Sequence, residues 1–123
     1  MRSMRKRAVV GVLAASALGL GGITAIGLGA TTTKSIQAKD PLAYSVKTLT
    51  VPAGKLTIKM VNKGSIPHDI AIKGKGIKTV KGKIVPKGGS TSVTATLKKG
   101  KYTFYCTVPG HEQAGMKGTL KVT

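Results

Sequence analysis

Beyond residue 40, apolar and polar positions alternate with a period of two, as in a β-strand that buries one face. The segment LTIKM, for example, places Leu56, Ile58 and Met60 on one side and lysine and threonine on the other. Gly and Pro residues divide the region into short pieces, and no ten-residue window has the period of a helix. This pattern predicts strands over 42–50, 55–61, 68–73, 90–97, 101–107 and 117–123.

Short strands of this kind predict an all-β fold, a Greek-key β-sandwich of antiparallel strands in two packed sheets. A connection rich in lysine and glycine, residues 73–89, separates the third strand from the fourth. Residues 40–123 are enough for one domain with a modest core. We therefore expect a single domain over 40–123.

The first 30 residues do not follow this pattern. Four basic residues lie in the segment 2–7, RSMRKR, and the run Ala8–Ala30 that follows has 23 residues and no charge. A basic segment before an apolar one is typical of a secretory signal, although the apolar part of a signal usually has only about 7–15 residues. A run of roughly 20 apolar residues could also span a bilayer. We expect residues 1–30 to be a signal peptide or an N-terminal membrane anchor, and residues 31–39 to be a linker.

Either leader would place residues 40–123 outside the cytoplasm, in the periplasm or on the extracellular face of the membrane. Exported small domains often contain disulfides, but the chain has one cysteine, Cys106, which cannot form a bridge within the chain. A metal ion would both explain the thiol and stabilise a small domain.

Strand alternation gives the direction of the side chains that could bind such an ion. Cys106 has the parity of Tyr102 and Phe104, so it points inward with them. By the same rule His68 and Met116 point inward from the ends of their strands. If those strand ends meet, the only cysteine, a histidine and a methionine converge on one region, and His111 lies in the short loop between Cys106 and Met116.

These four side chains fit copper better than the alternatives. A thiolate with two imidazoles makes a trigonal site, and a weak axial thioether completes the blue-copper pattern. Zinc prefers a harder fourth ligand, or water in a catalytic site. A Cys/His nucleophile is chemically feasible, but a thiol that points into a small sandwich has no evident cleft. The chain also lacks the C-x-x-C-H motif that attaches haem. We therefore expect a metal site and no enzyme.

The net charge outside the leader is strongly positive. From Thr31 onward there are 17 lysines and no arginine against three carboxylates, a balance of +14. Such a surface keeps a protein soluble, and it can also steer it toward an acidic partner or an anionic membrane surface. Nucleic acid is not expected, since its recognition favours arginine forks and stacking aromatic side chains. Residues 31–123 have no arginine and only four aromatic side chains.

Residues 40–123 resemble a cupredoxin, the small blue-copper family that includes plastocyanin, azurin, auracyanin and rusticyanin. The C-terminal match is the segment YCTVPGHEQAGM, residues 105–116, followed by the strand KGTLKVT. Its spacing, Y-C-x4-H-x4-M, is similar to that of auracyanin or rusticyanin. The upstream match is NKGSIPHDIAI, residues 62–72, where the family places its first histidine ligand at a strand start.

The resemblance implies one copper ion with His68, Cys106 and His111 as equatorial ligands and Met116 as the axial ligand. It implies one-electron transfer between redox partners, with the electron leaving through the edge of His111 and a small apolar patch around it. Lysines around this patch would favour an acidic redox protein, bound weakly by a monomeric carrier.

One position departs from the family pattern. Many members have Asn after the first histidine, where it braces the ligand loop by hydrogen bonds to the Ser or Thr after the cysteine. This chain has Asp69 opposite Thr107. An ionised carboxylate only accepts hydrogen bonds, so the brace would be rewired. Its charge would also stabilise Cu(II) and lower the reduction potential.

Two other functions remain open at this point. A copper carrier or storage protein would deliver the metal instead of electrons, because soft ligands also suit Cu(I). A cationic surface-adhesion module would bind anionic membranes whether or not Cys106 is present.

Overall fold

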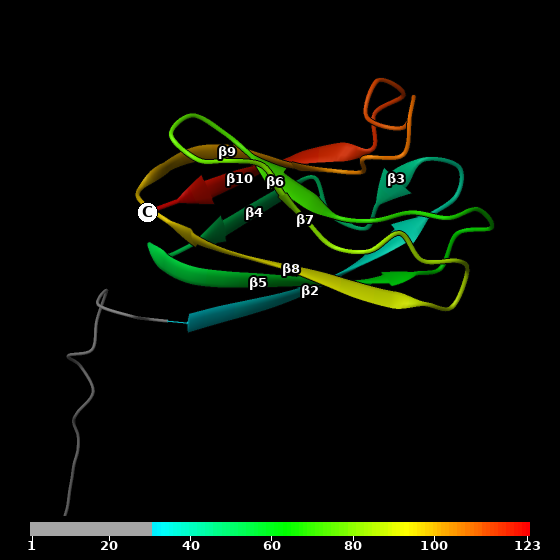
Figure 1. The fold of residues 1–123 in the computed structure, drawn as a ribbon, viewed down its shortest axis with the longest axis horizontal. Coiled ribbons are helices and arrows are strands. Elements are labelled where there is room, and N and C mark those ends of the chain that lie inside the picture. The colour runs from blue at the N-terminus through cyan, green and yellow to red at the C-terminus, as the bar shows by residue number, and fades with distance from the viewer. Residues whose placement is uncertain (1–30) are drawn as a thin grey trace, which may run out of the picture. The chain divides into compact units, whose positions relative to one another are not determined.

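The computed structural model describes residues 31–123, which form two β-sheets packed face to face (Figure 1). The all-β sandwich expected from the sequence is confirmed, and the leader expected over residues 1–30 lies outside the described residues. One sheet has the strand order β3-β2-β5-β8, and the other has the order β4-β10-β9-β6-β7. The strands are β2 (Thr31–Lys39), β3 (Ala43–Tyr44), β4 (Thr48–Val51), β5 (Gly54–Asn62), β6 (Ala71–Lys73), β7 (Val80–Lys81), β8 (Ser90–Leu97), β9 (Gly100–Tyr105) and β10 (Lys117–Val122).

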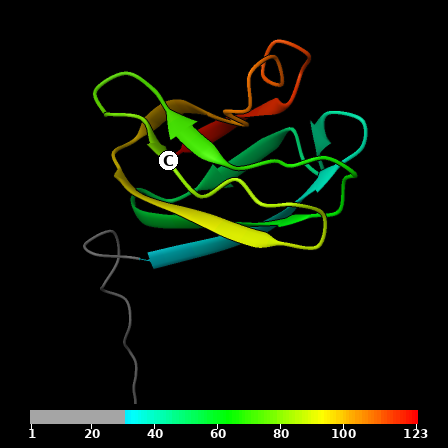
Figure 2. The same ribbon diagram turned by 45° about the vertical axis from the view of Figure 1, so that its right-hand side comes forward.

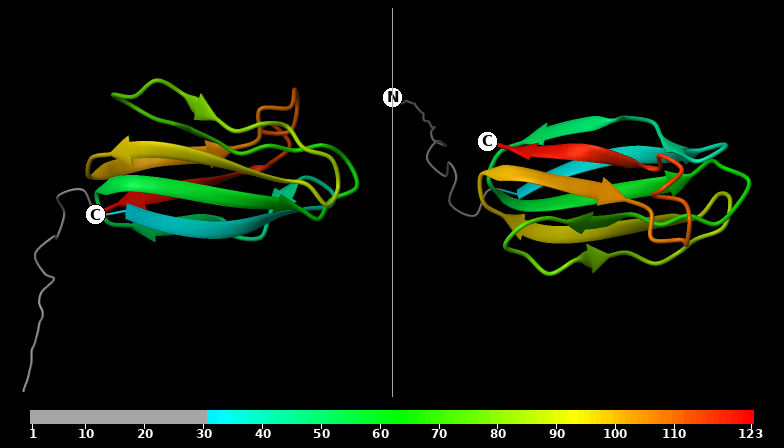
Figure 3. Two further views of the ribbon diagram at one scale, coloured as in Figure 1. Left: turned by 60° about the horizontal axis from the view of Figure 1, so that its bottom comes forward. Right: turned by 90° about the horizontal axis from the view of Figure 1, so that it is seen from above.

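The segment 31–39 is a strand, so the expectation of a linker there is wrong. Figure 3 shows β2 lying along β5, with which it pairs in parallel from Thr31 opposite Lys55 to Ala38 opposite Asn62. Its sequence, TTTKSIQAK, buries only Ile36 and Ala38 fully. The strand is mostly polar because its outer face is solvated, and its backbone completes the hydrogen bonding of β5.

The expectation of purely antiparallel strands is also wrong. Besides β2 with β5, strand β10 pairs in parallel with β4, and the remaining pairings are antiparallel. The predicted strand 42–50 is divided, because its start is β3 in the four-stranded sheet and its end is β4 in the five-stranded sheet. The connection 73–89 contains the short strand β7, which pairs with β6. Strand β8 has the predicted bounds.

The inner faces of both sheets form one core. Phe104, Leu56, Ile58, Met60, Ile70, Ile72, Met116 and Leu120 are among its fully buried side chains. Phe104 requires a glycine opposite it in β10, since a Cβ on Gly118 would lie 2.2 Å from the Phe104 ring and 2.7 Å from the Lys47 carbonyl oxygen. The ring of Phe104, two residues before Cys106, therefore lies close against the backbone of β10 at Gly118.

The strands of the sandwich run between two ends, both seen in Figure 2. At the end that we call the site end, β5 stops at Asn62, β9 stops at Tyr105, and β10 begins at Lys117. At the opposite end, the far end, β2 begins at Thr31 and the turn between β8 and β9 reverses the chain at Gly100. Residues 31–123 contain no helix, and so none with the length and hydropathy to cross a membrane.

Candidate metal centre

Three potential ligand atoms meet at the site end. The Nδ1 atoms of His68 and His111 are 3.3 Å apart. The Sγ atom of Cys106 lies 3.4 Å from Nδ1 of His111 and 3.9 Å from Nδ1 of His68. Among the residues that the structure describes, these three form the one group of His, Cys, Asp and Glu side chains close enough to hold a metal ion. The two histidines and the cysteine selected from the sequence are thus brought together, although His68 and Cys106 are 38 residues apart.

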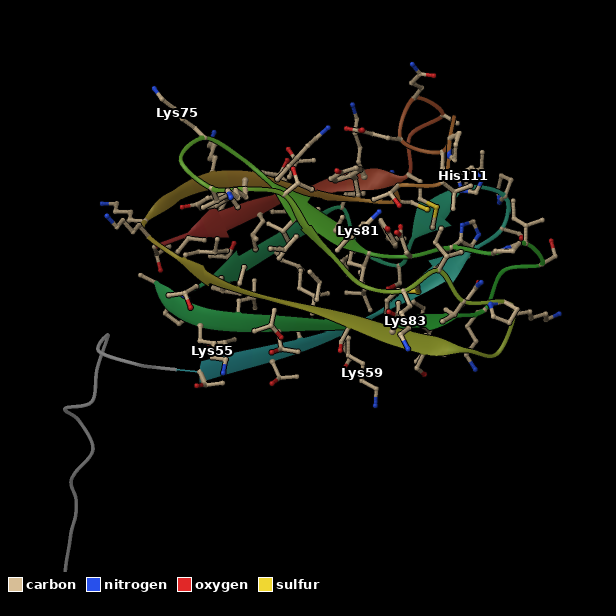
Figure 4. The ribbon with its side chains drawn as sticks, viewed as in Figure 1. Lys55, Lys59, Lys75, Lys81, Lys83 and His111 are labelled. Atoms are coloured by element: carbon tan, nitrogen blue, oxygen red, sulfur yellow. The ribbon has the colours of Figure 1, made fainter. Side chains whose placement is uncertain are left out.

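The three side chains are shielded from solvent. His68 and Cys106 are at most 1% exposed, and His111 is 9% exposed. His111 therefore presents only a small edge to solvent at this end of the sandwich, where Figure 4 labels it.

A short antiparallel bridge holds His68 in place. Its N–H donates to the carbonyl of Val85 at 3.1 Å, and the N–H of Val85 donates back at 2.9 Å. The expected strand 68–73 is longer than the observed one: β6 begins only at Ala71, so His68 precedes the regular ladder. The inward direction predicted from strand parity is nevertheless correct, since the side chain is fully buried.

Asn62 organises the loop before His68, and sequence analysis did not identify it. Its side-chain amide donates to the carbonyls of Ile66 and Val85 at 2.9 Å, and its oxygen accepts from the N–H of Gly64 at 2.8 Å. Asn62 is fully buried with all these bonds made. The only signal in the sequence is a polar residue at an inward position of a strand that is otherwise apolar on that face.

The segment between Cys106 and Met116 is a compact loop closed by backbone hydrogen bonds. The N–H of Met116 donates to the carbonyl of His111 at 3.0 Å, and the N–H of Cys106 donates to the carbonyl of Met116 at 3.2 Å. Gly110 and Gly115 have φ angles of 84° and 110°, which strain residues with side chains. Met116 is fully buried. The loop thus ties the backbones of the three residues selected from it directly to one another.

An ion pair fastens this loop to the sheet. The ammonium group of Lys73, at the end of β6, donates to the Glu112 carboxylate at 2.5 Å. The same ammonium lies 4.3 Å from the centre of the Tyr105 ring. Because Glu112 directly follows His111, the pair restrains the loop next to the imidazole.

The expected rewiring around Asp69 is seen in its hydrogen bonds. Asp69 is fully buried, and its two oxygens accept from the N–H of Thr107 at 2.7 Å and from the Thr107 hydroxyl at 2.5 Å. Both bonds run toward the carboxylate, as an acceptor-only side chain requires. Tyr44 donates its hydroxyl to the Asp69 carbonyl at 2.6 Å. The brace between the histidine segment and the cysteine segment is therefore present, with a carboxyl group where many members have an amide.

Burial sets the ionisation of the ligand atoms without a metal. Burial, and then the nearby His111, lower the pKa of His68 from its usual 6.5, so the imidazole is held neutral. Burial also raises the pKa of the Cys106 thiol above 9.0, although the N–H groups of Asp69 and Val108 act in the opposite direction. A neutral imidazole is ready to bind a metal, whereas the thiol must release its proton to do so.

The hydrogen-bond partners of the His68 ring nitrogens are also consistent with a bound metal ion. Its Nε2 atom is buried and has no hydrogen-bond partner among the described residues. Its Nδ1 atom faces only the other two donor atoms, all within 4.8 Å of one another. Two buried imidazole nitrogens and a buried sulfur share few protons, so a cation at their centre would satisfy lone pairs that the protein leaves unused. Imidazole and thiolate are ligands that suit copper.

Comparison with known proteins points the same way. Residues 30–123 match the family model of copper-binding proteins described as the plastocyanin/azurin family. Three solved auracyanin structures are similar to this chain. One, reduced with dithionite, comes from the photosynthetic bacterium Roseiflexus castenholzii; it has 31% sequence identity and a TM-score of 0.68, over 77% of this chain and 99% of that chain.

The other two are less similar in sequence. The structure of auracyanin B has 27% identity and a TM-score of 0.66, over 75% of this chain and 88% of that chain. Auracyanin A, described as a "blue" copper protein from the green thermophilic photosynthetic bacterium Chloroflexus aurantiacus, has 25% identity and a TM-score of 0.65, over 76% and 100%. A sequence search of curated proteins finds no match.

Proposed function

Because the chain belongs to the plastocyanin/azurin family of copper-binding proteins, the cupredoxins, we propose that it is a blue-copper carrier of single electrons. The proposed ligands are His68, Cys106, His111 and Met116. The observation that carries this assignment is the buried convergence of two Nδ1 atoms and one Sγ within 4.8 Å. Copper bound there would exchange one electron by alternating between Cu(I) and Cu(II).

The role of the protein in this reaction is to hold the ligands still. The ligand loop is closed by its own backbone bonds, and the Lys73–Glu112 pair fixes it to the sheet. Asn62 and Asp69 fix the segment that carries His68. Ligands that move little between the two oxidation states keep the cost of reorganisation low, which is what fast transfer needs.

We propose that the electron leaves through the edge of His111, the most exposed of the three converging side chains. Apolar residues lie close to His68 and His111 in the sequence, among them Ile66, which is 40% exposed, and the exposed Pro109, and we expect them to form a patch around this edge. Such a patch suits a weak, short-lived complex, and the lysines of the surface favour an acidic redox protein. The carrier is expected to act as a monomer and to have no enzymatic activity of its own.

The leader of residues 1–30 is proposed to export the protein, either as a cleaved signal peptide or as a retained anchor. The sandwich would then work in the periplasm or on the extracellular face of the membrane. Copper delivery, the alternative function, is less well supported, because ligands that are at most 9% exposed favour retention of the metal.

The test is to add Cu(II) to the purified protein and record its visible spectrum. We expect one equivalent of copper to produce an intense thiolate-to-copper band that reductant bleaches and oxidant restores. The band should be absent in Cys106→Ser and in His111→Ala, whereas Glu112→Gln, in the same loop, should keep it. A colourless complex would refute the proposal, and rapid loss of Cu(I) to a chelator would favour delivery.

A further inference from the structure

The carboxylates of the described chain all lie at one end of the sandwich. Asp69 is bonded to the segment after Cys106, and Glu112 belongs to the ligand loop. Asp40 follows the last residue of β2 and accepts from the backbone and hydroxyl of Ser65, three residues before His68. The site end therefore contains all three acidic side chains of residues 31–123, and the far end contains none.

The far end is instead surrounded by lysines. They come from the strand ends of both sheets and from the loops β6–β7 and β8–β9, and all are exposed. Figure 4 shows two of them, Lys55 and Lys75, at the end opposite His111. We call this group the far-end lysine cluster; its members are Lys55, Lys75, Lys78, Lys98, Lys99, Lys101 and Lys121.

The cluster is uncompensated within the described chain. The one ion pair in residues 31–123 is Lys73–Glu112, which lies outside the cluster. Lys101 and Lys121 are directly opposite each other in the pairing of β9 with β10, an arrangement of like charges that destabilises a sheet. A terminal carboxylate on Thr123 would offset at most one of the seven charges. Solubility depends on the net charge and does not require the lysines to lie at one end of the molecule.

The surface between the two loops is hollowed. A cavity of about 370 Å³ is lined by Lys75, Lys98 and Lys99, together with the ring of Tyr102. Three lysines line this hollow, and their flexible side chains could turn their ammonium groups toward a single phosphate group. The far end thus offers both a broad positive surface and a pocket of headgroup size.

The direction of the chain indicates what covers this surface. Residue Thr31 pairs with Lys55, so whatever precedes Thr31 enters the sandwich beside the cluster. The preceding run Ala8–Ala30 is uncharged and long enough to span a bilayer. If a bilayer holds this run, the far end is the part of residues 31–123 joined to it by the shortest length of chain. Lysines next to a membrane-directed segment are attracted to anionic lipids.

We propose that the far-end lysine cluster docks on an anionic phospholipid surface, with the Lys75–Lys98–Lys99 hollow taking a lipid phosphate. Docking in this direction turns the site end, with His111, away from the bilayer and toward soluble partners. The inference goes beyond the proposed function and does not depend on copper, because no ligand residue belongs to the cluster.

The test compares two variants of equal charge in the full chain, so that the leader contributes equally to each. In the cluster variant, Lys75, Lys98, Lys99 and Lys101 are changed to Gln; in the matched control, Lys39, Lys59, Lys63 and Lys87 are changed to Gln, all of them exposed and outside the cluster. Flotation measures binding to phosphatidylcholine vesicles with and without phosphatidylglycerol. Salt is raised from about 0.1 M to about 1 M, which shortens the Debye length from about 10 Å to about 3 Å.

We expect phosphatidylglycerol to strengthen binding of the wild type at low salt only. In the cluster variant, the increase in affinity caused by phosphatidylglycerol should be at least about tenfold smaller than in the wild type, because each lysine near an anionic surface raises the affinity several-fold. The control variant should keep most of the increase. Equal losses in both variants would overturn the proposal, because charge alone would then suffice. Soluble polyaspartate that binds through the same lysines more tightly than the vesicles do would overturn it in favour of an acidic protein.

A second measurement covers the case in which the leader alone carries the chain to the vesicles. Acetylation of each lysine is followed by mass spectrometry on the full chain bound to either vesicle. Phosphatidylglycerol should protect the cluster lysines and leave Lys39 and Lys63 reactive. Uniform labelling of all lysines would refute the proposed orientation.

Discussion

At the site end, the polar side chains of His68, Asn62 and Asp69 are fully buried. Asn62 and Asp69 are hydrogen-bonded to protein groups, whereas Nε2 of His68 has no partner among the described residues. At the far end, polar side chains are exposed and carry like charge, with Lys101 directly opposite Lys121. Buried, satisfied hydrogen bonds make a structure rigid, whereas exposed charge acts over roughly a Debye length, about 8–10 Å, without fixing any atom. Each end thus has the kind of polar interaction that its proposed task requires.

Copper removal should produce the largest change, and only through the site end. Copper at about a thousandfold above its dissociation constant stabilises the folded state by about 4 kcal/mol. For a domain of this size we expect a melting temperature higher by at least about 10 °C, measured by calorimetry with and without Cu(II). The shift should largely vanish in His111→Ala and persist in Lys98→Gln. An equal shift in both variants would mean that copper stabilises through some other site.

Asn62→Ala should be the most damaging change outside the proposed ligands. It removes two donated bonds and one accepted bond: the Val85 carbonyl keeps only the His68 N–H, while the Ile66 carbonyl and the Gly64 N–H lose the Asn62 side chain as partner. The expected loss is about 3 kcal/mol in the free energy of unfolding by urea. Thr94→Ala is the control, because its hydroxyl bonds only to Thr57 on an exposed face. Similar losses in the two variants would contradict the idea that Asn62 organises the site end.

Asp69→Asn should change the electronic properties of the centre more than its stability. Asn can accept from the Thr107 N–H and donate to the Thr107 hydroxyl, so the brace can be kept. Removal of a negative charge should destabilise Cu(II) by about 1–2 kcal/mol at an effective dielectric constant of about 20. The reduction potential should therefore rise by on the order of 50 mV, as measured by voltammetry. An unchanged or lower potential would show that the charge of Asp69 is compensated.

The pH dependence of the metal-free protein should come mainly from the site end. The pKa of His68 is lowered in the folded state, so stability should fall as pH drops below 6.5. The pKa of Cys106 is raised, so stability should also fall as pH rises above 9.0. Urea unfolding at pH values below 6.5 and above 9.0 measures both slopes. Loss of the acid slope in His68→Gln would confirm its source, and an unaltered slope would assign it elsewhere.

Lys121→Glu should have the smallest effect and the opposite sign. It converts the like-charge pair with Lys101 into an attractive pair, worth about 0.2–1 kcal/mol of added stability. The gain in urea unfolding should shrink at high salt, because both side chains are exposed. Neither the visible band nor the reduction potential should change. A measurable change in either would show that the two ends are coupled.

Much of the site could be predicted from the sequence, because successive side chains of a strand point to opposite faces of the sheet. Parity placed His68, Cys106 and Met116 toward the interior, and all three are buried. His111 lies in a loop, where parity gives no direction, so it was selected through its spacing and its chemistry. Asn62 was not identified, because the carbonyls it bonds belong to loops whose positions local patterns do not specify.

The strand β2 shows the complementary limit. Only Ile36 and Ala38 of this strand are fully buried, so most of its positions can be polar. A polar segment of this kind looks like a linker in the sequence. What makes the segment a strand is the unpaired edge of β5, which is a non-local property. The parallel pairings were not predicted for the same reason, because the sequence of a strand says little about which distant strand it pairs with.

The parallel course of β2 along β5 fixes how high the metal centre stands above the point where the chain enters the sandwich. Nine residues of strand rise about 3.3 Å each, so Lys39 stands about 25–30 Å above Thr31. On a bilayer, the length of β2 would keep His111 away from the headgroups and out of reach of any acceptor that lies flat in the membrane. Only partners that protrude to a similar height, or that diffuse freely above the surface, could then meet it.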